Sequence, residues 1–152
     1  MSKFKTFAKA ILIPVILGSI VGLLISGSMD YNSLKQPFFA PPSWLFPIVW
    51  SILYILMGVS YGILDINSLV DAKVNLIYYL QLFVNLLWPI IFFILKWRFF
   101  AFLWIIFLLI LIIIMIVRFY NKDKTAALLQ IPYLLWTIFA TFLNLSIYLL
   151  NR

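Results

Sequence analysis

Apolar residues dominate the chain in long stretches, and polar residues are largely confined to the short segments between them. Each stretch approaches or exceeds the ~20 residues that a helix needs to cross the hydrocarbon core of a bilayer. The pattern therefore predicts an all-α membrane protein, a five-transmembrane-helix bundle in one domain, with a lid loop between the first two helices. The predicted helices cover about residues 8–27, 44–64, 74–95, 99–118 and 125–150, and the lid loop covers residues 28–43, all within a single domain of residues 1–152.

The first apolar stretch follows a lysine-rich start and ends in small residues. A basic start, an apolar core and small residues are also the parts of a secretory signal peptide. The stretch is long for such a core and the rest of the chain is equally apolar, so an uncleaved first helix is favoured. Gly18, Gly22 and Ser26 lie at successive turns of this helix, and we expect their face to let another helix approach closely.

The segment from residue 27 to residue 43 interrupts the apolar pattern. Pro37, Pro41 and Pro42 hold its backbone in an extended conformation. The segment is nevertheless unusually apolar for a loop, and such a loop usually covers an apolar surface. It predicts either a lid over a ligand or a lid that only packs on the bundle. Its aromatic residues are Tyr31, Phe38 and Phe39.

One face of the second helix carries small and aromatic residues, and the other faces carry Leu, Ile and Val suited to lipid. Trp and Tyr near helix ends are usually interfacial residues. Trp50 and Tyr54 lie further inside the helix, where that explanation weakens, so we expect this face to point inward. The face consists of Pro47, Trp50, Tyr54, Gly58 and Tyr61.

The third helix carries two amides one turn apart, Gln81 and Asn85, and Trp88 and Phe92 continue the same face. Buried amides need partners where water is absent, so both must face protein or a cavity. Hydrogen bonds between helices alone would also account for them. Pro89 should kink this helix.

The last helix repeats this arrangement of aromatic and amide residues, whereas the fourth helix is uniformly apolar and should be the most lipid-exposed or purely structural one. The last helix places the following residues on one face: Pro132, Trp136, Ala140, Asn144 and Tyr148.

The residue types exclude much conventional chemistry. The chain has no Cys and no His, and its four acidic residues are all Asp. Thiolate or imidazole metal sites, His-ligated haem and Ser-His-Asp or Cys-His nucleophiles are therefore absent. We predict no metal site and no firm catalytic residue.

The formal net charge of +7 raises the possibility of nucleic-acid binding. The cations flank the apolar stretches, however, where they would lie at lipid headgroups, so a nucleic-acid partner is not expected. The excess of Lys and Arg on one side of the bundle predicts a cytoplasmic N-terminus in the cell membrane. That side would hold Lys3, Lys5, Lys9, Lys73, Arg118, Lys122 and Lys124, and the other Lys35, Lys96, Arg98 and Arg152.

Three segments, in order, resemble one known family. They read YNSLKQPFFAPPSWLFPIVWSILYILMG (31–58), QLFVNLLWPIIFF (81–93) and PYLLWTIFATFLN (132–144). The chain resembles the tryptophan-rich sensory proteins, bacterial relatives of the mitochondrial translocator protein, also called the peripheral benzodiazepine receptor (TspO/MBR). The resemblance implies a five-helix bundle, often a homodimer, whose pocket under the first loop binds porphyrins, sterols and isoquinoline or benzodiazepine-type drugs.

The resemblance also implies which residues line the pocket. Asp30 stands where bacterial relatives often have Trp, which predicts a looser or more polar lid. The sterol-contact pattern does not align at Tyr148, so sterol binding is not expected. Matching the family motifs gives Trp50, Tyr54, Asn85, Trp88, Phe92, Trp136, Ala140 and Asn144 as ligand-binding residues, with Tyr31 closing the pocket from the loop.

Two functional hypotheses follow. In one, the protein is a receptor, sensor or carrier that binds tetrapyrroles by stacking and hydrogen bonding, without a metal or further cofactor. In the other, porphyrin is a substrate degraded under light and oxygen, with Trp50 and Trp136 as possible redox residues. A small multidrug exporter fits less well, because such a protein normally needs an ionisable group in mid-membrane.

Overall fold

The computed structural model describes residues 2–152 and contains five helices that are long and apolar enough to cross a membrane. The predicted all-α bundle is therefore confirmed. The helices are α1 (Lys3–Ile25), α2 (Leu45–Ile66), α3 (Ala72–Pro89), α4 (Arg98–Tyr120), α5 (Lys124–Leu128) and α6 (Ile131–Asn151), with short helical turns η1 (Ser26–Ser28), η2 (Tyr31–Ser33) and η3 (Ile90–Ile94).

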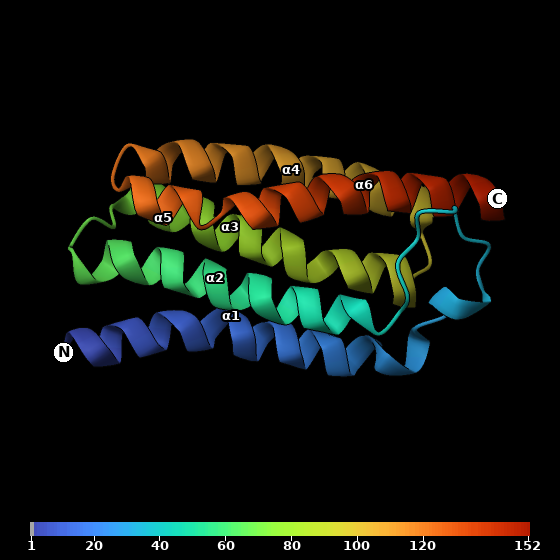
Figure 1. Cartoon of the computed structure of the whole chain (residues 1–152), viewed down its shortest axis with the longest axis horizontal. Helices are drawn as coiled ribbons and strands as arrows, with labels where there is room; N and C mark the ends of the chain where they lie inside the picture. Colours follow the sequence, from blue (N-terminus) through green and yellow to red (C-terminus); the bar gives the residue numbers. More distant parts are fainter. Residues whose placement is uncertain (1) are drawn as a thin grey trace.

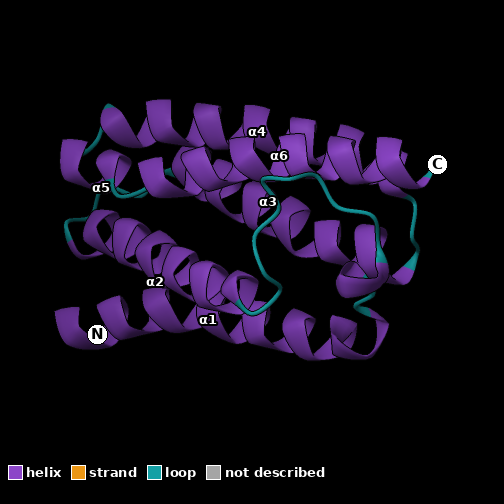
Figure 2. Ribbon diagram, turned by 45° about the vertical axis from the view of Figure 1, so that its right-hand side comes forward, coloured by secondary structure: helices purple, strands orange, loops and turns teal. Residues whose placement is uncertain are grey.

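The long helices run roughly along one common axis, so the bundle has two distinct ends (Figure 1). The N-terminus lies at the end that also holds the α2–α3 and α4–α5 connections. The C-terminus lies at the other end, together with the lid (residues 28–43), which returns across the bundle to the start of α2 (Figure 2). α1 packs chiefly on α2, and α4 packs chiefly on α3 and α6.

The first helix begins at Lys3 rather than near residue 8. Ser2 caps it, because its hydroxyl accepts a hydrogen bond from the Lys5 N–H at 3.2 Å. Ser is a favoured N-cap residue, since it satisfies one of the N–H groups left free at a helix start. The helix therefore includes the lysine-rich segment that the sequence pattern placed before it.

The last predicted helix, residues 125–150, is not continuous: a short turn at Leu129 and Gln130 separates α5 from α6. Pro132 explains the break. Proline has no N–H, and its ring clashes with the carbonyl four residues earlier, here that of Leu128, the last residue of α5. Pro132 is instead accommodated in the first turn of α6, where the missing N–H costs least.

Pro89 distorts the third helix, as predicted. After it the chain makes one wider turn, η3, in which the Leu95 N–H donates to the Ile90 carbonyl at 3.0 Å. Wide turns of this kind are a known cause of helix distortion and are frequent at functional sites. This turn carries Phe92 and Phe93, and both are buried.

The main core lies where α2, α3 and α4 meet α5 and α6. Met57 and Leu64 of α2 are fully buried there, as are Ile112, Met115 and Phe119 of α4. The fourth helix is thus less lipid-exposed than expected, because it buries one face in the core and presents only the other to lipid. α1 reaches this core only through the buried Ala10 and the partly buried Ile13, and it buries few of its residues.

α1 and α2 approach each other most closely at Gly58. A Cβ atom there would lie 2.5 Å from the Ile11 Cα and 2.7 Å from the Ala10 carbonyl oxygen, and both belong to the backbone. Backbone atoms cannot turn aside as the end of a side chain can, so the contact requires glycine at this position. At Gly22 of α1, by contrast, a Cβ atom would meet nothing within 4 Å.

The Gly58→Ala variant should therefore be less stable than the parent protein. Forcing α1 away from α2 should cost about 1–3 kcal/mol, the usual range for overpacking. Thermal unfolding in detergent measures the effect as a lower midpoint. The matched control is Gly22→Ala, which should be neutral or stabilising by up to about 1 kcal/mol because Ala is the better helix former. Equal midpoints for the two variants would show that Gly58 is not a tight contact.

Candidate ligand-binding cavity

A cavity of about 580 Å³ lies among α1, α2, α3, η3 and α6, beneath the lid. This volume is within the roughly 300–1,000 Å³ of typical small-molecule sites. The cavity brings together all nine residues that the sequence analysis assigned to a ligand site, although their role in binding stays a prediction. They are Tyr31, Trp50, Tyr54, Asn85, Trp88, Phe92, Trp136, Ala140 and Asn144.

Small residues of α1 make room for this cavity. The ring of Tyr54 occupies the space that a side chain at Gly18 would need, whereas the space beside Gly22 is open. Gly22 and Ser26 line the cavity. The expectation that this face would let another helix approach closely is therefore wrong for Gly22, and the close helix contact lies at Gly58 instead.

A chain of hydrogen bonds runs from the cavity wall, where Tyr54 and Asn85 lie, into the core of the bundle. The Tyr54 hydroxyl donates to Asn85 Oδ1 at 2.6 Å, and Asn85 Nδ2 donates to the Tyr133 hydroxyl at 2.8 Å. Tyr133 in turn donates to Gln81 Oε1 at 2.8 Å, and Gln81 Nε2 donates to the Tyr78 carbonyl at 2.9 Å. The chain joins α2, α3 and α6, so it fixes three of the helices around the cavity.

This network resolves the two alternatives for the amides of the third helix. Gln81 is fully buried and serves only contacts between protein groups, whereas Asn85 both lines the cavity and links α2 to α6. Both polar ends of Asn85 are used within the protein. Tyr133 was not among the predicted site residues, because nothing in the local sequence separates it from the other polar side chains of α6, such as Thr137 and Asn144.

A second hydrogen-bonded group lies nearer the lid. Trp88 Nε1 donates to Asn144 Oδ1 at 3.0 Å, and Asn144 Nδ2 donates to the Arg98 backbone carbonyl at 2.9 Å. The Trp88 ring stacks on Phe92 with centroids 5.0 Å apart and an interplanar angle of 28°. These contacts hold one indole plane in a fixed orientation along the cavity wall.

Trp136 differs from Trp88, because its indole N–H is buried and makes no hydrogen bond to any described residue. Aromatic contacts alone hold it, to Phe46 at 5.9 Å and to Phe139 at 5.3 Å between ring centroids. Trp50 lies 5.8 Å from Tyr54 by the same measure. A buried indole N–H without a partner is a donor that a ligand could satisfy.

Tyr31 anchors the lid over the cavity. Its ring is buried edge-on against Phe46, with centroids 5.0 Å apart, and its hydroxyl donates to the Pro41 carbonyl at 2.7 Å. Burial raises the pKa of the Tyr31 phenol above its usual value of 10.0, so the group stays a donor at neutral pH. Gln36 Nε2 donates to the Tyr31 carbonyl at 2.7 Å, which closes the lid on itself.

Two further contacts tie the lid to the bundle. Both Asp30 carboxylate oxygens accept from the Arg98 guanidinium at 2.7 Å, and Lys96 lies 3.7 Å away. The Lys35 backbone exchanges two hydrogen bonds with the Asn151 side chain, at 3.0 and 2.9 Å. Asp30 thus links the lid to α4 through Arg98, and of the two expectations for Asp30, a looser or a more polar lid, the ion pair agrees with the second.

Several residues that shared a predicted face lie outside the cavity. Gly58 and Tyr61 pack in the bundle beyond it, Pro132 lies on the outer surface between α2 and α6, and Tyr148 packs against Phe99 at 5.2 Å between centroids. Helical spacing places these residues on the faces predicted for α2 and α6, but only part of each face lines the cavity.

The fold and the cavity define a class, a multi-pass membrane protein with an aromatic cavity between its helices. The model of the TspO/MBR family matches residues 10–150, so the chain belongs to that family and the resemblance is confirmed.

Individual relatives agree with this assignment. The chain is 43% identical to the tryptophan-rich protein TspO of Archaeoglobus fulgidus over 122 residues, which cover 80% of this chain and 79% of the relative. It is 37% identical to protein CrtK of Rhodobacter capsulatus over 135 residues, covering 86% and 83%. It is 32% identical to the tryptophan-rich sensory protein of Cereibacter sphaeroides over 149 residues, covering 97% and 90%.

The Asp30→Asn variant should open the lid more often. Hydrogen bonds to a charged group contribute about 1.5–3 kcal/mol, which corresponds to about a 10- to 100-fold change in the opening equilibrium. Hydrogen exchange measures it at the Ser33 and Leu34 amides, which donate to carbonyls of the lid. Both amides should exchange at least tenfold faster.

Asp71→Asn is the matched control, because it removes an ion pair at the opposite end of the bundle. Asp71 lies 2.8 Å from Lys122, and this hydrogen bond lowers the pKa of Asp71, so the pair is charged at neutral pH. The control should leave exchange in the lid unchanged. Unchanged exchange in Asp30→Asn as well would show that the ion pair does not hold the lid.

Proposed function

We propose that the protein is a membrane receptor that binds porphyrins of the protoporphyrin type, and related flat aromatic molecules such as isoquinoline or benzodiazepine-type drugs. The observation that supports this most is the convergence of Trp50, Trp88 and Trp136 on one cavity beneath a tied lid. Large flat ligands gain most from apolar walls and from stacking on aromatic rings, with a few polar groups to orient them.

The same cavity accounts for how such a ligand would be oriented. Trp88 is fixed by its hydrogen bond to Asn144, so it offers a rigid plane for stacking. The Trp136 N–H has no partner in the protein, so it offers a donor to a ligand acceptor. Tyr54 and Asn85 satisfy each other and would shape the wall without competing for the ligand.

In this proposal the protein acts as a sensor or carrier in the regulation of tetrapyrroles or of stress responses. The name of the Cereibacter sphaeroides relative describes that protein as sensory, which supports the sensor reading. The protein would lie in the cell membrane with its N-terminus in the cytoplasm. Supporting this orientation, the lysine-rich N-terminus lies at the same end as the α2–α3 and α4–α5 connections (Figure 1). Lys122 lies in the α4–α5 connection, and Lys73, Arg118 and Lys124 lie in the adjoining helix ends. Homodimers, as in other family members, are part of the proposal.

A second candidate function is light- and oxygen-dependent degradation of bound porphyrin. The observation that favours it is that two tryptophans, Trp50 and Trp136, both line the cavity. A light-excited porphyrin would take an electron from one of the two indoles and pass it to dioxygen, which becomes superoxide. The indole radical cation would then take an electron back from the porphyrin, so that porphyrin is the net electron donor and dioxygen the oxidant. The protein would contribute position and shielding from water.

Filling the cavity should abolish binding. Gly22→Phe places a ring in the open space beside α1 without a backbone clash, so protoporphyrin affinity should fall at least tenfold. Gly27→Phe is the matched control, since Gly27 also has open space but does not line the cavity. Titration with quenching of tryptophan fluorescence measures both. Equal affinities for the two variants would place the ligand elsewhere.

Replacing the indoles of Trp50 and Trp136 tests the stacking contribution. Aromatic pairs contribute about 0.5–1.5 kcal/mol each, so Trp50→Phe with Trp136→Phe should weaken porphyrin binding about tenfold. A double variant with parental affinity and parental quenching would show that these residues are not part of the site.

Illumination separates the two candidate functions. If the protein is a catalyst, loss of protoporphyrin absorbance should require light and oxygen and should slow at least tenfold in the double variant when the porphyrin is saturating. Porphyrin loss at the same rate with parent protein, with the double variant and without protein would rule out the catalytic function and leave the receptor function.

A further inference from the structure

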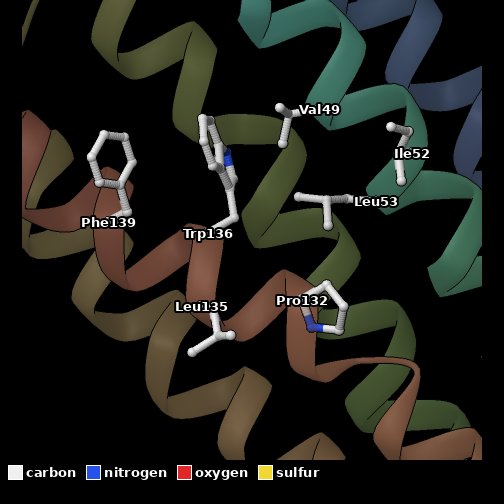
Figure 3. A pocket seen from close by; sticks show the side chains of 7 residues that line it. All are labelled: Val49, Ile52, Leu53, Pro132, Leu135, Trp136 and Phe139. Carbon is white, nitrogen blue, oxygen red and sulfur yellow. The ribbon is translucent and has the colours of Figure 1, made fainter. Parts of the chain in front are cut away.

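A second hollow lies on the outer surface of the bundle, between α2 and α6 (Figure 3). Its volume is about 420 Å³, and all of its lining side chains are apolar. Ile52 and Leu135 at its rim are 52% and 61% exposed, so in a bilayer the groove would face the acyl chains. It is lined by Val49, Ile52, Leu53, Pro132, Leu135, Trp136 and Phe139.

Trp136 is the one residue that lines both this outer groove and the inner cavity. Its side chain projects from α6 toward the gap between the two helices, as Figure 3 shows. The indole therefore separates the space that faces lipid from the space that would hold the ligand. A change in the rotamer of this one side chain would join the two spaces.

The contacts of Trp136 leave it freer to move than the neighbouring indoles. Trp88 donates to Asn144 and Trp104 donates to the Val84 carbonyl at 2.8 Å, whereas Trp136 donates to no described residue. Moving Trp136 would thus break no hydrogen bond. It would even let the buried N–H find a partner, which lowers the cost of the movement.

The helices on either side of the groove contact each other through aromatic side chains, but in the described part of the chain side-chain hydrogen bonds link them only through other helices. Side-chain hydrogen bonds link α2 to α3 through Tyr54 and to α5 through Ser60, and they link α6 to α3 through Tyr133. Among residues 2–152, no side-chain hydrogen bond joins α2 to α6. The groove between α2 and α6 can therefore widen by losing apolar contacts, and contacts with lipid tails replace these.

Aromatic contacts connect the groove to the lid. Tyr31 of the lid packs on Phe46, Phe46 packs on Trp136, and Trp136 packs on Phe139. Phe139 in turn contacts Phe39 of the lid, with centroids 6.0 Å apart. The lid can stay closed over the cavity while a ligand passes sideways, because Trp136 packs on Phe46 of α2 and Phe139 of α6 and makes no aromatic contact with residues 28–43.

We propose that the groove between α2 and α6 is the membrane-side entrance to the cavity and that Trp136 is its gate. The occupant is a flat, largely apolar aromatic molecule with a hydrogen-bond acceptor, which arrives dissolved in the bilayer and accepts from the Trp136 N–H as it passes. This inference rests on the proposed function. It adds the route by which the ligand enters. It also predicts that the groove residues affect the rates of association and dissociation and not the affinity.

The absence of cysteine from the chain allows a direct test. Leu135→Cys, modified with a bulky aliphatic maleimide, would block the groove without entering the cavity. Phe142→Cys is the matched control, because Phe142 lies on the same helix, is 62% exposed and lines neither space. Both proteins are reconstituted in lipid nanodiscs and mixed with protoporphyrin, and quenching of tryptophan fluorescence is followed by stopped flow.

The label at Leu135 should slow association and dissociation by the same factor, at least tenfold, and leave Kd within twofold. The label at Phe142 should change neither rate. Parental rates with the Leu135 label would overturn the proposal, as would a raised Kd with an unchanged association rate. Both outcomes presuppose that the unlabelled parent protein binds porphyrin. If it does not bind porphyrin, the proposed function is wrong, and so is the proposed entrance.

Discussion

The absence of water from a bilayer is the constraint on which this structure depends. A buried polar side chain that finds no partner within the protein costs several kcal/mol in hydrocarbon. The series Tyr54, Asn85, Tyr133 and Gln81 meets this constraint and joins α2, α3 and α6, whereas the Trp136 N–H is left without a partner among the described residues. Tyr54 and Asn85 also line the cavity, so groups that hold the helices together help to determine the shape of the candidate site.

The cavity needs a second condition, a helix that contacts the core closely near one end and leaves space near the other. α1 touches the bundle closely at Gly58 of α2, where only glycine fits, and it presents small residues such as Gly22 toward the cavity. The lid then closes the open end through the Asp30–Arg98 ion pair and the buried Tyr31. Tight contact at one end of α1 and open space at the other follow from where the glycines lie.

Much of this arrangement could be predicted from the sequence. Apolar length gave the five membrane spans, because a bilayer imposes a minimum length on any helix that crosses it. Helical spacing and the family motifs together placed Trp50, Asn85 and Trp136 among the cavity residues. The break before Pro132 was missed, although proline chemistry alone favours it, because hydropathy does not register a turn between two apolar segments.

Contacts between distant segments could not be predicted in this way. The partner of Asp30 is Arg98, and that of Asn85 is Tyr133, and no local pattern pairs residues so far apart in the chain. The opposite roles of Gly22 and Gly58 were equally hidden, since both are glycines in apolar helices and only the position of the neighbouring helix separates them. Helical periodicity gives a face, and tertiary packing decides how much of that face lines a cavity.

We expect a flat aromatic ligand to lie inside the cavity between α1, α2, α3 and α6. The most direct test is the NMR spectrum of the indole N–H groups, with and without protoporphyrin, since the ring current of the ligand shifts nearby nuclei. The account predicts shifts at Trp50, Trp88 and Trp136, which line the cavity, and none at Trp44, Trp97 and Trp104, which do not. Shifts confined to the second set, or equal shifts at all indoles, would contradict it.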